Sequence, residues 1–139
     1  GSKVIHFVNC FHGRTGYTMS LTNTNDPRKY MYFPRFDWPR IPAPYAEFPL
    51  TGKNLENTLK REAQSLAILR GYLTANHTDV ACILLEPVQG EGGDNHFRPE
   101  YWQELRKIAD EFEVLLIADE VQAGMGLTGK MWSYEHYDV

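Results

Sequence analysis

The sequence predicts an α/β fold with a mostly parallel sheet and flanking helices. Three apolar or β-branched runs, at residues 3–10, 80–87 and 114–121, are typical of strands. Their near-continuous apolar character favours strands buried on both faces, as in a parallel sheet. Residues 98–113, between the second and third runs, carry apolar side chains at helical spacing. The pattern therefore predicts a strand, a helix and a second strand in succession.

Two further segments complete the predicted architecture. Residues 54–73 place leucines on one face and polar residues on the other, which predicts an amphipathic helix packed on the sheet. Pro99 suits the first turn of the helix at 98–113. Residues 34–49 hold five of the eight prolines together with several aromatic residues, so we expect an extended connection rather than a helix or central strand.

Composition restricts the cellular setting and the class of partner. A chain of 139 residues with 42% hydrophobic residues fits a single domain. The net charge of -4, without a basic block, argues against nucleic acid and membrane partners and favours a small molecule. Cys10 and Cys82 are isolated thiols, and neither a signal peptide nor a spanning segment is visible, so we expect a cytoplasmic protein. Gly1 and Ser2 are typical of a cloning remnant.

The ends of the predicted strands are the places to look for a site. In α/β sheets, ligands bind outside the carboxyl ends of the strands. Asp119 follows the apolar run at 114–118 directly, and a carboxylate there needs a partner that offsets its desolvation. That partner could be a metal ion, a structural arginine or helix N-terminus, or a cationic ligand such as a protonated ring nitrogen. The residues alone leave these alternatives open.

Several other kinds of site are disfavoured by spacing. Residues 124–129, "GMGLTG", match a dinucleotide-binding pattern, but the acids at 119 and 120 would repel a pyrophosphate, so glycines of a turn are favoured. Cys10 and His12 are too close along one predicted strand to act as nucleophile and base. No metal site is predicted, because the candidate ligands match no known spacing. Those candidates are Glu86, Glu91, Asp94, His96, Asp119 and Glu120.

Four stretches taken together resemble one family. "FHGRTGYTMSLTNT" (11–24), "FDWPRIPAPY" (36–45), "LLEPVQGEGGDNHFRPEYW" (84–102) and "LLIADEVQAGMGLTGKMW" (115–132) are similar to the class III aminotransferases, which depend on pyridoxal phosphate. Within that family they are most similar to lysine 6-aminotransferases, with 4-aminobutyrate aminotransferases next. The resemblance spans residues 3–139 and implies the central part of a fold type I large domain. It also implies a homodimeric parent enzyme.

The resemblance implies a reaction and a role for each matching residue. L-lysine and 2-oxoglutarate would give 2-aminoadipate 6-semialdehyde and glutamate. Asp119 would hold the pyridine nitrogen of the cofactor as a pyridinium, whereas Glu120, on the opposite face of the strand, would be structural. The other cofactor-binding positions would be Phe11, His12, Gly13, Glu86 and Gln122. The substrate-binding positions would be Arg14, for a substrate carboxylate, and Glu91, which would pair with a second arginine and release it for 2-oxoglutarate.

The sequence also departs from the family pattern. None of its six lysines stands at the position of the lysine that binds the cofactor covalently, which we expect downstream of Val139. We likewise expect the phosphate-binding loop and the second arginine outside these residues, so the 139-residue chain alone should be inactive. The alternatives are a parent specific for 4-aminobutyrate or another ω-amino acid, and a non-catalytic scaffold that has lost the lysine.

Overall fold

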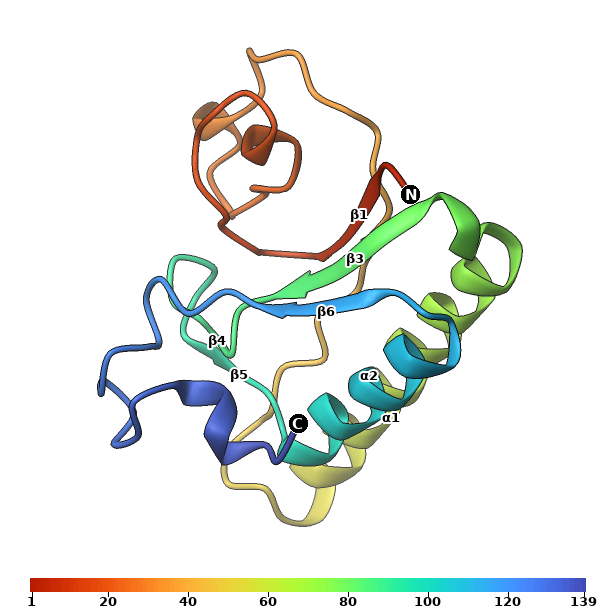
Figure 1. Cartoon of the computed structure of the whole chain (residues 1–139). Coiled ribbons are helices and arrows are strands. Elements are labelled where there is room, and N and C mark those ends of the chain that lie inside the picture. Colours follow the sequence, from red (N-terminus) through yellow and green to blue (C-terminus); the bar gives the residue numbers. More distant parts are fainter.

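A four-stranded parallel sheet forms the centre of the computed structural model, which describes all 139 residues (Figure 1). The order of its strands is β2-β1-β3-β6. Their bounds are Arg40–Ile41 for β2, Lys3–Phe7 for β1, Val80–Leu85 for β3 and Leu115–Ala118 for β6. A small antiparallel ribbon, β4 (Val88–Gln89) with β5 (Asn95–His96), follows β3. The predicted α/β class with a mostly parallel sheet is confirmed.

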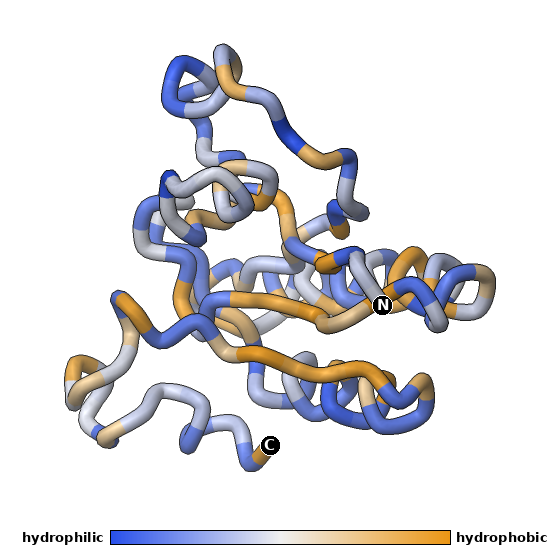
Figure 2. The backbone as a smooth tube through the Cα atoms, turned by 45° about the horizontal axis from the view of Figure 1, so that its top comes forward, coloured by the Kyte–Doolittle hydropathy of each residue, from blue (hydrophilic) through white to orange (hydrophobic).

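Two helices cover one face of this sheet. α1 spans Gly52–Asn76 and α2 spans Pro99–Glu111, close to the predicted ranges. Because side chains alternate along a strand, every second residue of the strands reaches the helices. These residues join the inner faces of α1 and α2 in one hydrophobic core. Its fully buried members include Ile5, Phe7, Ile83, Leu85, Leu69, Leu73, Trp102, Leu105 and Ile108. Figure 2 shows the hydrophobic residues concentrated along the central strands.

β1 ends earlier than the sequence predicts. The apolar run continues to residue 10, but the strand stops at Phe7. Asn9 has a φ of 63°, in the left-handed region that interrupts an extended strand. The side chain of Asn23 stabilises this turn, because its Oδ1 accepts the Asn9 N–H at 2.8 Å and its Nδ2 donates to the Phe7 carbonyl at 2.9 Å. The residues after Asn9 therefore leave the strand and run along its carboxyl end.

β6 is the second departure from the prediction. Burial on both faces was expected, but Leu115 is 67% exposed and Ile117 is 41% exposed. Leu116 and Ala118 point the other way and pack against the core. The reason is that α1 and α2 lie on one face of the sheet, so the other face is left uncovered at β6 (Figure 1). The apolar run therefore indicated a strand correctly but overstated its burial.

The remaining segments are held by aromatic contacts. The proline-rich residues 34–49 contain only the short strand β2, as the prolines predict. Tyr17, Phe36 and Trp38 stack in succession, with ring centroids 5.5 and 5.1 Å apart. Near the C-terminus, Tyr137 stacks on Trp102 at 5.3 Å and returns the chain to α2. No helix is both long enough and apolar enough to span a membrane.

Candidate functional site

The three predicted strand ends meet around one cavity. Each segment lies directly after β1, β3 or β6, because parallel strands bring their carboxyl ends to the same edge of the sheet. The cavity has a volume of about 160 Å³. All six cofactor-binding residues implied by the resemblance line it, together with Val121. They are Phe11, His12, Gly13, Glu86, Asp119 and Gln122. The structure therefore brings together residues that lie far apart in the sequence.

Asp119 has a partner that the sequence reasoning missed. Its Oδ2 lies 2.6 Å from Nδ1 of His12, whose side chain is only 2% exposed. Its Oδ1 accepts the Val121 N–H at 3.1 Å. The hydrogen bond from His12 is the main influence on the pKa of Asp119 and holds it below the usual range, whereas partial burial opposes this shift. Asp119 is thus a carboxylate, and a carboxylate can only accept, so Nδ1 of His12 carries the hydrogen.

Glu86 has the opposite protonation preference. The residue is 5% exposed, its Oε1 accepts the Phe11 N–H at 3.0 Å, and the same atom lies 3.9 Å from Nε2 of His12. Burial raises the pKa of Glu86 to about 8; the Phe11 N–H opposes the shift, and the negative charge of Asp119 adds to it. One charged and one neutral carboxyl therefore flank the imidazole near neutral pH.

This burial predicts a pH-dependent stability. Because the pKa of Glu86 is higher in the folded state, that state binds more protons than the unfolded chain between about pH 5 and pH 8. The free energy of unfolding should therefore fall as the pH rises through this window, by an amount of the order of 4 kcal/mol. Urea denaturation of the wild type and of Glu86→Gln across this range measures it. We expect the variant to lack this decline, while His6 and other groups act equally on both proteins. Parallel curves would contradict the prediction.

The two implied substrate-binding residues lie outside the cofactor cavity. Gly13 has a φ of 102°, a conformation suited to glycine, and it turns the chain so that Arg14 leaves the sheet edge. Arg14 lines a separate cavity of about 500 Å³, with Tyr17 and Phe36 among its walls. Glu91 lies in the loop between β4 and β5 and pairs with Lys29, at 3.1 Å between Oε2 and Nζ.

Two further expectations from the sequence are met. Glu120 accepts the backbone N–H groups of Ser133 and Tyr134 at 3.0 and 2.7 Å, as expected of a structural acid. The glycines at 124–129 lie in turns rather than at the start of a helix, and Gly126 and Gly129 have φ values of 89° and 91°. These φ values explain glycine there without a nucleotide.

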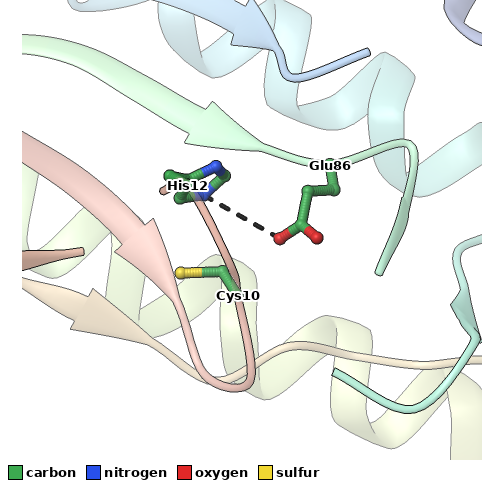
Figure 3. Close-up of side chains that lie close together, drawn as sticks. All are labelled: Cys10, His12 and Glu86. Carbon is green, nitrogen blue, oxygen red and sulfur yellow. Dashed lines mark ion pairs between the residues drawn. The ribbon is translucent and has the colours of Figure 1, made fainter. Parts of the chain in front are cut away.

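The side chain of Cys10 lies close to those of His12 and Glu86, a proximity that the sequence did not indicate. The potential ligand atoms of the three side chains lie within 4.8 Å of one another (Figure 3). The early turn at Asn9 is responsible, because it removes Cys10 and His12 from the strand on which they were expected. A prediction based on spacing along one strand could not anticipate this cluster.

The comparisons with known proteins agree with one another. The family model for Aminotransferase class-III matches residues 1–139. The L-lysine-epsilon aminotransferase of Mycobacterium tuberculosis is 49% identical over 139 residues, which cover 100% of this chain and 30% of that protein. The 4-aminobutyrate aminotransferase of Emericella nidulans is 38% identical over 137 residues, covering 99% of this chain and 27% of that protein. A solved structure of the lysine aminotransferase from M. tuberculosis superposes with a TM-score of 0.93 at 49% identity, covering 100% of this chain and 31% of that one. The chain thus spans about 30% of the length of the curated lysine relative.

Proposed function

The chain belongs to the class III aminotransferase family, and on that premise we propose that it supplies part of the active site of a lysine 6-aminotransferase. The proposed enzyme transfers the terminal amine of L-lysine to 2-oxoglutarate and yields 2-aminoadipate 6-semialdehyde and glutamate. The identity of 49% to a lysine relative, against 38% to a 4-aminobutyrate relative, supports this choice of donor. The structural observation that carries the proposal is the partly buried His12–Asp119 pair at the carboxyl ends of the strands.

The residues of the cavity fit pyridoxal phosphate. An ionised carboxylate offers about four lone-pair positions, and Asp119 uses two of them for His12 and Val121. The carboxylate is 17% exposed and lines the cavity, so it retains capacity to accept from a protonated pyridine nitrogen. Phe11 supplies an aromatic wall suited to a flat ring. When bound, the cofactor supplies an electron sink for the carbanion formed from the amine substrate.

The other cavity residues keep Asp119 suitable for this task. The hydrogen bond from His12 fixes the orientation of the carboxylate and favours its charged form. Glu86, when neutral, adds no second negative charge to the pocket. Gln122 lines the same cavity, and we propose that it binds the phenolic oxygen of the cofactor. The chain thus contributes a fixed charge, an aromatic wall and an amide.

The cavity offers no lysine for covalent attachment of the cofactor. None of the six lysines of the chain lines the cavity. We therefore assign the lysine that binds the cofactor to a region outside these 139 residues and propose that the chain alone is inactive. We also propose that residues 3–139 form part of a large domain in a homodimeric, cytoplasmic enzyme. The two free buried thiols, Cys10 and Cys82, support a reducing compartment.

The choice of substrate is tested by an assay of the complete protein. Glutamate formation from 2-oxoglutarate is measured with L-lysine and, separately, with 4-aminobutyrate as the amine donor. We expect kcat/KM to be at least about tenfold higher with lysine, because a difference of about 1.4 kcal/mol in transition-state binding suffices for that ratio. A preference for 4-aminobutyrate would reverse the assignment. If neither donor gave glutamate, the proposed function would be contradicted.

Arg14 gives the second test. We propose that its guanidinium binds the α-carboxylate of lysine, since a planar fork pairs with a carboxylate through two hydrogen bonds. Arg14→Ala should raise the KM for lysine by about 10- to 100-fold, as expected when a charged hydrogen bond worth about 1.5–3 kcal/mol is lost. The matched control is Arg35→Ala, because Arg35 stacks over Tyr30. An equal effect of the two variants would argue against this role for Arg14.

A further inference from the structure

Three buried side chains with different ligand atoms converge behind Asp119. Cys10 follows β1, His12 lies two residues later, and Glu86 follows β3. Their sulfur, nitrogen and oxygen atoms lie within 4.8 Å of one another (Figure 3). Cys10 is 0% exposed, Glu86 is 5% exposed and the His12 side chain is 2% exposed. The cluster is therefore a compact group of potential ligands shielded from water.

His12 directs an unpartnered nitrogen into this cluster. Its Nδ1 donates to Asp119, so Nε2 on the other side of the ring is the nitrogen left for a ligand, and in the neutral ring it presents a lone pair. Nε2 is buried and has no hydrogen-bond partner. The nearest carboxylate oxygen, on Glu86, is 3.9 Å away and thus beyond hydrogen-bond distance. Buried polar atoms are normally paired, so this lone pair lacks a ligand of its own.

We propose that Cys10, His12 and Glu86 form a binding site for one Zn²⁺ ion. Thiolate, imidazole and carboxylate are the three side-chain ligands that zinc takes in tetrahedral sites, with bonds of about 2.0–2.3 Å. Such bonds place ligand atoms roughly 3.3–3.8 Å apart, so the observed cluster needs a contraction of only about 1 Å. The cavity of about 160 Å³ that Glu86 and His12 line leaves room for a fourth ligand.

Charge balance and the surroundings of His12 support the same ion. Without an ion both acids favour their neutral forms, because burial raises the pKa of the Cys10 thiol and that of Glu86. Binding of Zn²⁺ would displace both protons, and the resulting thiolate and carboxylate would carry two negative charges that match the charge of the ion. A histidine that binds a metal usually donates its other ring N–H to a carboxylate, a backbone carbonyl or water. Asp119 already occupies that position, at 2.6 Å from Nδ1.

The proposed ion would oppose a cationic ligand at Asp119. Asp119 and the cluster lie on opposite sides of the same imidazole, so a bound Zn²⁺ would place positive charge one ring away from the carboxylate. The site would thus be inhibitory if Asp119 holds a protonated ring. The binding of zinc itself does not depend on the proposed function.

The test is a metal titration of the complete protein after removal of metal with a chelator. Zn²⁺ is titrated against a coloured chelator, and Co²⁺ is used in parallel because thiolate ligation gives it a charge-transfer band. We expect one Zn²⁺ and one thiolate band per chain in the wild type. Cys10→Ala should abolish the band and weaken zinc binding at least about 100-fold. The matched control Cys82→Ala changes the other buried thiol and should retain both signals.

A second variant guards against a folding defect in the first. Glu86→Gln keeps the shape of the side chain but removes its negative charge, so it should also weaken zinc binding while circular dichroism stays unchanged. Unchanged zinc affinity in both Cys10→Ala and Glu86→Gln would overturn the proposal. The absence of a thiolate band in the wild type with Co²⁺ would overturn it as well.

Discussion

Replacement of Asp119 with asparagine is expected to lower the turnover of the complete protein about a thousandfold. Asparagine keeps the size of the side chain but cannot carry the negative charge that the His12 hydrogen bond maintains. Opposite charges about 4 Å apart attract by about 4 kcal/mol at an effective dielectric constant near 20. Loss of that energy from the transition state corresponds to about three orders of magnitude in rate. Glutamate formation from lysine and 2-oxoglutarate measures it.

Glu120→Gln provides the matched control for this substitution. Glu120 is the adjacent acid, but its carboxylate accepts the N–H groups of Ser133 and Tyr134 rather than lining the cofactor cavity. We expect its replacement to affect stability more than turnover. If Asp119→Asn retained more than about a tenth of the wild-type turnover, an energy of this size could not be assigned to Asp119.

Replacement of Glu62 with alanine is expected to lower the free energy of unfolding by about 3–5 kcal/mol. Glu62 lies on α1 and is 6% exposed. Its two carboxylate oxygens accept from Nε and a terminal nitrogen of Arg98 at 2.9 and 2.8 Å. Arg98 directly precedes α2, so the ion pair links α1 to the start of α2. Alanine would leave the poorly exposed guanidinium without its main partner. Urea denaturation measures the loss.

The control for Glu62 is a second glutamate that contacts the same arginine. Glu100 also contacts Arg98, at 3.2 Å, but its side chain is 61% exposed. Glu100→Ala should therefore cost no more than about 1 kcal/mol, as is usual for exposed ion pairs. Replacing both partners, as in Glu62→Leu with Arg98→Met, should recover much of the loss because no buried charge remains unpaired. Equal effects of Glu62→Ala and Glu100→Ala would contradict the assignment.

The fold was largely predictable because the spacing of apolar residues along a helix or strand indicates which of its side chains are buried. Both helices were found within a few residues of their true ends, since the 3.6-residue pattern extends over several turns. Local exceptions were harder to foresee. The end of β1 depends on the side chain of Asn23 stabilising a left-handed Asn9, which no periodic pattern records. The exposure of Leu115 depends on which face of the sheet the helices cover.

The convergence of the strand-end residues on one cavity was predictable, but the hydrogen bonds between them were not. The matching motifs and the rule of strand ends identified six residues that line one cavity. The His12–Asp119 hydrogen bond was missed because it joins residues after β1 and β6, which are separated by β3. Such a pairing depends on how far each strand reaches. The contact between Lys29 and Glu91 was missed for a similar reason, because both lie in irregular loops.

The exposed edge strand β6 also bears on how the chain avoids self-association. Leu115, Ile117 and Val121 are exposed, and an open apolar edge can pair with the same strand of another molecule. Acidic residues stand at both ends of this stretch, namely Glu113 before it and Asp119 and Glu120 after it. Two copies aligned in parallel would bring these like charges together and repel each other. The acids that flank the strand therefore also disfavour parallel pairing of β6 with a second copy of the chain.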